Sequence, residues 1–248
     1  MRSYLPSALL VTVVIGLWEL IVRVFAVPAY LFPPPSLVVQ ALQDHAATLA
    51  QHFGITMLES VLGFGMGSLL GIVLATVFFH VRAVKESTYP LAIAIESTPT
   101  VALAPLLILW FGNGIWAKVA ASALLCFFPV LVGCMKGFNA VPPEAVDLFN
   151  SMGGSKAHIF TKLRFPHSLP YLFAALKVAS SLAVIGAIVG EFAGADKGLG
   201  YVIVTSGYLL ETPTMFAAIL LTSVGGMLFF GLVALLDKKI LHWHCAED

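Results

Sequence analysis

Six apolar segments, each about twenty residues or longer, limit how this chain can fold. At a rise of ~1.5 Å per residue, about twenty helical residues cross the ~30 Å hydrocarbon layer of a membrane. Apolar residues make up 59% of the 248 and charged residues only 10%, unlike the composition of soluble domains. The sequence therefore predicts an all-α integral membrane protein with about six transmembrane helices. The predicted spans are Pro6–Val27, Phe53–Phe79, Tyr89–Phe111, Ile115–Met135, Tyr171–Glu191 and Thr214–Leu236.

The distribution of lysine and arginine predicts the orientation of these spans, because both residues favour cytoplasmic loops. With a cytoplasmic N-terminus, the outer segments hold only Arg23, Lys118 and Lys197. Both termini are therefore predicted to be cytoplasmic. The first segment could instead be a cleaved signal peptide, although Arg2 is its only basic start. The inner segments hold Arg2, Arg82, Lys85, Lys136, Lys156, Lys162, Arg164, Lys238 and Lys239.

The outer segment after the first span has a pattern of its own. Pro33, Pro34 and Pro35 predict a stiff, extended turn. Residues Ser36–Ala50 then predict an amphipathic helix that has Ser36 as its N-cap.

Small residues recur every four positions in two of the spans, which predicts that these helices pack closely in a bundle. Such stripes allow a neighbouring backbone to approach, as in other membrane helices. They are Gly63, Gly67 and Gly71 in the second span, and Ala175, Ala179, Ala183 and Ala187 in the fifth.

Glu96, Pro99, Glu59 and Glu191 are candidates for a translocation pathway. A proline at mid-span frees a backbone carbonyl, which is tolerated where the helix is buried in protein or lines a cavity. Ionisable groups at membrane depth face a bundle interior or an aqueous path. Each carboxylate could instead belong to a structural pair, and Lys177 in the fifth span is a candidate partner.

The segment Val141–Pro170 is a polar, basic insert in an otherwise apolar chain. Pro142 and Pro143 suit the first turn of a helix, and Gly153 and Gly154 suit its end. The insert is therefore predicted to form two short helices on the cytoplasmic side.

The first of these helices carries an apolar face made of Ala145, Leu148, Phe149 and Met152 at helical spacing. Such a face on the cytoplasmic side could dock on another protein. Alternatively, it could rest on lipid headgroups.

No catalytic or metal-binding constellation is recognisable in the sequence. It contains neither a Gly-x-Ser-x-Gly motif nor a phosphate-binding loop that ends in Gly-Lys-Ser/Thr. The histidines lack metal-ligand spacing, and Cys126, Cys134 and Cys245 form no paired framework. A net charge of zero gives no case for nucleic-acid binding. The chain is therefore predicted to be no enzyme and to hold no cofactor, so that any ATP-driven step needs a separate subunit.

The insert resembles the Glu-Ala-Ala loop of permease subunits of bacterial ABC importers, whose pattern runs Glu-Ala-Ala, Gly, then Ile-x-Leu-Pro. Gly153 and Pro166 take the places of its Gly and Pro. The acidic position then falls on Asp147 rather than on Glu144. By this resemblance, the site that couples to the ATPase consists of Asp147, Leu148, Phe149, Met152, Gly153 and Pro166.

The resemblance extends over roughly residues 31–203 and follows the nitrate/sulfonate/taurine-type branch of these permeases. It is carried by stretches such as ESVLGFGMGSLLGIVLA, STPTVALAPLLILWFGNGIWAK and LPYLFAALKVASSLAVIGAIVGEFAG. The wording around Ser97–Lys118 and Leu176–Gly194 is most similar to permeases for pyrimidine-type vitamin precursors. The family implies a type I importer fold in the bacterial inner membrane. Residues 1–248 would form one permease domain, with 141–170 as its coupling loop.

The same resemblance implies partners. A second permease copy would complete a homodimer, two ABC ATPase subunits would bind ATP and Mg, and an extracytoplasmic binding protein would deliver the substrate. The alternative is an ion-coupled secondary transporter that uses Glu96, Glu59 or Glu191 as coupling groups. Such transporters contain inverted repeats, and the sequence shows no convincing pair.

Overall fold

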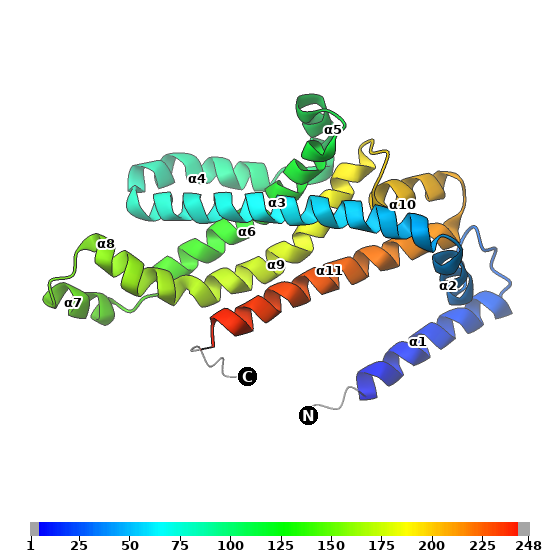
Figure 1. Ribbon diagram of the computed structural model, residues 1–248, viewed down its shortest axis with the longest axis horizontal. Coiled ribbons are helices and arrows are strands. Elements are labelled where there is room, and N and C mark those ends of the chain that lie inside the picture. The colour runs from blue at the N-terminus through cyan, green and yellow to red at the C-terminus, as the bar shows by residue number, and fades with distance from the viewer. Residues whose placement is uncertain (1–4, 243–248) are drawn as a thin grey trace.

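The computed structural model describes residues 5–242, and this part of the chain is helical throughout, without a β-strand (Figure 1). Arg2, which entered the prediction of orientation, and Cys245, which was considered as a possible disulfide partner, lie outside the described residues. The helices are α1 (Leu5–Val24), α2 (Pro35–Asp44), α3 (Ala46–His80), α4 (Arg82–Glu96), α5 (Thr100–Phe111), α6 (Ile115–Asn139), α7 (Pro143–Ser151), α8 (Lys156–Ile159), a π-helical segment η1 (Phe160–Arg164), α9 (Phe165–Phe192), α10 (Leu199–Tyr208) and α11 (Thr212–Ile240).

Four continuous helical stretches of the described chain are long and apolar enough to cross a membrane: Ala46–His80, Ile115–Asn139, Lys156–Phe192 and Thr212–Ile240. They correspond to four of the six predicted spans. The first predicted span is α1, a 20-residue apolar helix that falls outside this count.

The third predicted span, Tyr89–Phe111, is not one continuous helix but two helices separated by a break. Helices α4 and α5 meet at an angle of 102°, and the break lies at residues 97–99. Pro99 is the N-cap of α5 and cannot donate a backbone hydrogen bond. Its ring also clashes with a helical conformation of the preceding residue, Thr98. In contrast, Pro90 and Pro105 lie inside α4 and α5 without ending them.

The centre of the bundle is formed by α3, α6 and α9, which pack at the stripes of small residues. An added Cβ at Gly71 would lie 2.8 Å from the carbonyl oxygen of Phe127, and one at Gly186 would lie 2.9 Å from that of Ala121. Ala179 and Ala183 are fully buried, and their carbonyl oxygens accept hydrogen bonds from Cys126 and Ser122 of α6. The predicted close packing of these helices is confirmed.

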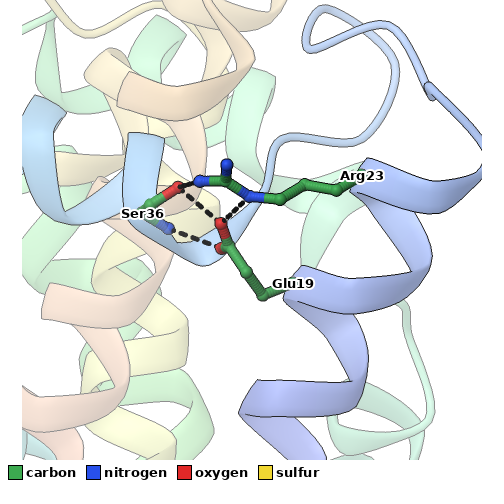
Figure 2. A network of polar contacts seen from close by, with 3 residues as sticks. All are labelled: Glu19, Arg23 and Ser36. Carbon is green, nitrogen blue, oxygen red and sulfur yellow. Dashed lines mark hydrogen bonds and ion pairs between the residues drawn. The ribbon is translucent and has the colours of Figure 1, made fainter.

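Helix α1 lies beside the bundle and is joined to it at its C-terminal end, next to α2 (Figure 1). There Glu19 forms an ion pair with Arg23 at 2.6 Å and accepts hydrogen bonds from the backbone N–H and hydroxyl of Ser36 (Figure 2). Trp18 packs on Phe32, with 5.2 Å between the ring centroids. Most of the remaining α1 side chains are exposed.

The helix predicted to follow Ser36 differs from that prediction in two ways. Pro34, not Ser36, is the N-cap of α2, and the Glu19 carboxylate supplies the cap by binding the Ser36 N–H. The helix also ends at Asp44, and His45 interrupts it before α3 begins at Ala46. The second half of the predicted outer helix is therefore the start of the long second span.

Candidate functional site

The predicted coupling helix is present as α7, and both of its ends follow from local sequence. Pro142 is the N-cap, Pro143 opens the first turn and Glu144 places negative charge near the N-terminus. At the other end Gly153 has a φ of +79°, which a residue with a side chain adopts only at a cost.

The turn at Gly153 has the bonds of a Schellman motif. The N–H of Gly154 donates to the carbonyl of Phe149 at 2.9 Å, and that of Gly153 donates to Asn150 at 3.0 Å. The chain therefore leaves α7 sharply and enters α8, whose N-cap Ser155 accepts a hydrogen bond from the His158 N–H. The predicted pair of short helices around a glycine turn is confirmed.

No residue of α7 is buried, and its apolar face is divided between the protein and the surroundings. Leu148 is 59% exposed and Met152 is 78% exposed, whereas Ala145 and Phe149 are half-buried. Asp147 is exposed and has no hydrogen bond or ion pair to another residue within 5–242. Leu148, Met152 and Asp147 are thus free to contact a partner.

Pro166, the last member of the predicted coupling site, lies at the start of α9 and not on α7. It lines an open groove of about 560 Å³ together with Lys162 and Tyr171. The chain between α7 and Pro166 runs through α8 and the π-helical segment η1. The predicted coupling residues therefore lie in two places: Asp147 to Gly153 in and directly after α7, and Pro166 at the start of α9.

Two of the predicted pathway carboxylates, Glu59 of α3 and Glu191 of α9, are brought together inside the bundle. Glu59 is 4% exposed and Glu191 is 1% exposed, and their carboxyl groups lie close enough to interact. Glu191 accepts hydrogen bonds from the Thr56 hydroxyl at 2.7 Å and from the Gly200 N–H at 2.5 Å. One oxygen of Glu59, Oε2, is buried without a hydrogen-bond partner in the described chain.

These contacts belong to a cap on the N-terminus of α10. The first N–H groups of this helix have no partner within it. Here those of Gly198 and Leu199 donate to His52 Nδ1 at 2.9 Å and to Thr56 Oγ1 at 2.8 Å, beside the Gly200–Glu191 bond. The helix dipole also favours a carboxylate at this end. We call His52, Thr56 and Glu191 with these three N–H groups the outer clamp, because they lie at the end of the bundle that the sequence predicts to be extracytoplasmic.

Lys118 of α6 lies near the outer clamp but does not neutralise it. Its side chain is 3% exposed, and its ammonium group donates to the carbonyl of Asn113 at 2.5 Å and to that of Gly114 at 3.2 Å. It forms no ion pair with a carboxylate of residues 5–242. Lys177, a candidate partner for a buried glutamate, instead pairs with Asp237 of α11 at 2.8 Å, which corrects that expectation.

Glu96 and Pro99 lie elsewhere, at the break between α4 and α5, and both are exposed in the single chain. The four predicted pathway residues thus lie in two separate regions: Glu59 and Glu191 inside the bundle, and Glu96 and Pro99 at the α4–α5 break. Sequence reasoning missed His52 and Thr56 in the outer clamp. The spacing of Thr56 and Glu59, one helical turn apart, was the available signal.

Among residues 5–242 no group of three or more His, Cys, Asp or Glu side chains could hold a metal ion. Cys126 and Cys134 are buried and free. The polar groups described above are used in helix caps and contacts between helices.

Residues 67–242 match the family described as "Binding-protein-dependent transport system inner membrane component". The chain belongs to this family. The permease is 36% identical to the formylaminopyrimidine transport permease ThiX of Halalkalibacterium halodurans, over 98% of both chains. It is also 30% identical to the riboflavin permease RibX of Chloroflexus aurantiacus, over 98% of this chain and 90% of that one.

Solved structures show the same fold. One chain of an amino acid ABC transporter superposes with a TM-score of 0.67 at 18% identity, covering 81% of this chain and 97% of that one. An inward-facing form of the MetNI methionine transporter gives 0.62 at 18% identity, covering 84% and 98%. The predicted type I importer permease fold is confirmed.

The family establishes what the chain does in outline. It is a membrane-embedded, multi-pass permease subunit of a binding-protein-dependent ABC importer, and it is not an enzyme. ATP hydrolysis belongs to a separate subunit in such importers, and a binding protein delivers the substrate. The family does not support the ion-coupled alternative.

Proposed function

We propose that this permease imports a pyrimidine or a related aromatic nitrogen heterocycle of the vitamin-precursor class. The proposal is carried by the full-length similarity to the formylaminopyrimidine permease at 36% identity. Sulfonate and taurine permeases are 25% to 28% identical to this chain, and a nitrate permease is 21% identical over 82% of it.

Thermal shift of the cognate binding protein tests this substrate class, with formylaminopyrimidine, riboflavin, taurine and nitrate as ligands. A ligand at about 100 times its Kd stabilises a protein by about 2.7 kcal/mol, which is readily measured. We expect stabilisation by formylaminopyrimidine. Stabilisation by taurine or nitrate alone would overturn the assignment.

We further propose that α7 docks in a groove of the ATPase subunit, which binds ATP and Mg. Leu148 and Met152 supply exposed apolar anchors, Phe149 supports them from the half-buried side, and Asp147 offers an unpaired charge. Gly153 lets the chain turn away after the docking helix. ATP-driven closure then moves the bundle, provided that its two states differ in their contacts with the nucleotide-bound ATPase.

Charge substitutions on α7 test the docking. Leu148→Asp and Met152→Asp change side chains that are exposed in the isolated chain, so they should leave insertion intact and prevent copurification of the ATPase. Ala157→Asp introduces the same charge at an exposed position of α8 and serves as the matched control. Normal copurification and uptake with Leu148→Asp and Met152→Asp would refute docking through α7.

The position of the motif acid has its own test. Asp147→Asn should weaken coupling, whereas Glu144→Gln should affect only the first turn of α7. The reverse order of effects would move the motif register to Glu144.

We also propose that two copies form a homodimer with cytoplasmic termini. The α4–α5 break, with Glu96 and Pro99, lines the translocation path. Glu59 and Glu191 are buried behind the lining of this path and hold its outer end in shape. The proposal is consistent with the large apolar side chains exposed on α5, among them Leu109 at 77% and Trp110 at 68%, which offer a surface for the second copy. A cysteine replacing Glu96 should crosslink to its counterpart and become accessible during turnover. Failure of both results would place the path elsewhere.

A further inference from the structure

The described contacts of α7 with the rest of the chain are few, so a displacement of this helix reaches the bundle through the chain on either side of it: residues 140–142, which lead back to α6, and the segment that follows α7. That segment is α8 and η1, which continue directly into α9. The π-helical geometry of Phe160–Arg164 widens the helix locally, and such turns are frequent at functional sites. Two of its side chains, Phe160 and Arg164, contact the ends of other spans.

Arg164 touches two helices besides its own. Its Nη1 donates a hydrogen bond of 2.7 Å to the carbonyl of Phe138, in the last turn of α6, where carbonyls lack a partner within the helix. Its guanidinium also lies over the ring of Phe79 near the end of α3, 5.0 Å from the centroid. A planar guanidinium can stack and donate at the same time, which a lysine ammonium cannot do.

Phe160 packs on the same two helices. Its ring centroid lies 5.7 Å from that of Phe79 and 5.2 Å from that of Phe138, and those two rings are 5.6 Å apart. The Arg164 hydrogen bond lies beside these rings and is partly buried, and such a bond is stronger where less water reaches it. We call Phe79, Phe138, Phe160 and Arg164 the inner node.

We propose that Arg164 is a positioning residue that transmits displacement of the coupling helix to α3 and α6. This inference rests on the proposed docking of α7. The inner node is the place where the segment leaving α7 is fastened to both helices at once. An arginine that only capped α6 would stabilise the protein without affecting how hydrolysis is linked to movement.

The test uses the transporter assembled with its ATPase in lipid, and it requires no knowledge of the substrate. A reporter cysteine replaces Leu209, which is 70% exposed near the end of α10, and carries a spin label. Its signal is compared between the nucleotide-free and the vanadate-trapped complex. With Arg164→Ala the signal change should fall about tenfold. A factor of this size lies within the range of about 5- to 150-fold that is typical of coupling between two sites. Basal hydrolysis and copurification of the ATPase should persist.

Arg164→Lys should restore part of the signal change, because it can donate to Phe138 but cannot stack on Phe79. Arg82→Ala is the matched control, since Arg82 forms only an exposed ion pair with Glu86 on α4. If Arg164→Ala does not accumulate, Phe79→Leu removes the stacking partner and should weaken the signal change while hydrolysis continues. If Arg164→Ala or Phe79→Leu showed the same signal change between the nucleotide-free and vanadate-trapped complexes as the wild type, the proposal would be overturned. Loss of copurification with the α7 variants, which tests docking, is a separate result.

Discussion

The two ends of the central bundle are fastened by different chemistry. The outer clamp fixes α10 to α3 and α9 through hydrogen bonds to three successive backbone N–H groups. The inner node fastens η1 to α3 and α6 with three aromatic rings and one arginine. Hydrogen bonds to buried N–H groups lose much of their strength when their geometry changes.

Aromatic rings behave differently, because a stacked or tilted pair stays favourable over a range of centroid separations. The ring pairs of Phe160 span 4.6 to 6.4 Å and include both stacked and T-shaped arrangements. The outer clamp therefore depends on one arrangement, whereas the ring pairs of the inner node tolerate a small shift while the Arg164 hydrogen bond keeps η1 attached to α6. The more adaptable packing therefore lies at the end of the bundle where α7 is proposed to dock on the ATPase.

The largest expected effect comes from Gly200→Ala in the outer clamp. An added Cβ would lie 2.7 Å from Glu191 Oε2 and 3.0 Å from the backbone carbonyl of Ile188, so the carboxylate must move from its donors. Overpacking and a weakened charged hydrogen bond together should cost about 3 kcal/mol of unfolding free energy. Thermal unfolding of the purified protein measures the loss.

Gly65→Ala is the control for this substitution. Gly65 also lies inside a helix, α3, but no atom stands within 4 Å of an added Cβ there. It should retain wild-type stability or gain slightly from better helix propensity. Equal losses at both positions would show that the clamp is not a tight fit.

The two buried glutamates should respond unequally to replacement by glutamine. Both oxygens of Glu191 accept hydrogen bonds, so Glu191→Gln should cost about 2 kcal/mol. Glu59 has an oxygen without a partner, and an amide at this position could donate to Glu191. Glu59→Gln should therefore change the unfolding free energy by less than about 0.5 kcal/mol. A larger loss at Glu59 would reverse the roles assigned to the pair.

The sequence predicted the elements with strong local signals and missed contacts between distant ones. Apolar runs, the small-residue stripes and the glycine turn after α7 were all predicted correctly, because spacing along one helix determines them. The 102° break at Pro99 and the ending of α2 at Asp44 depend on packing as well as on local residues. The outer clamp joins residues far apart in sequence, such as Thr56 and Leu199, and no periodicity in the sequence indicates such a pair.

Phe160→Leu tests whether the inner node is tolerant. Leucine keeps apolar volume at the node but loses the ring pairs, and the expected cost is about 1 kcal/mol. Phe25→Leu is the control, since Phe25 is 74% exposed and should show no loss. A loss as large as that of Gly200→Ala would mean that the inner node is as rigid as the outer clamp.

The smallest expected effect concerns the ion pair between Lys177 of α9 and Asp237 of α11. This pair is also polar, but its side chains keep 29% and 19% of their surface exposed, so it is less enclosed than the outer clamp. The double variant Lys177→Met and Asp237→Leu should lose about 0.5 kcal/mol, because both charges leave together. The single variant Lys177→Met should lose more, since Asp237 then has no partner. If the double variant instead lost as much unfolding free energy as Glu191→Gln, a partly exposed polar pair would contribute as much as the outer clamp. The enclosure of Glu191 at the N-terminus of α10 would then add little to its stability.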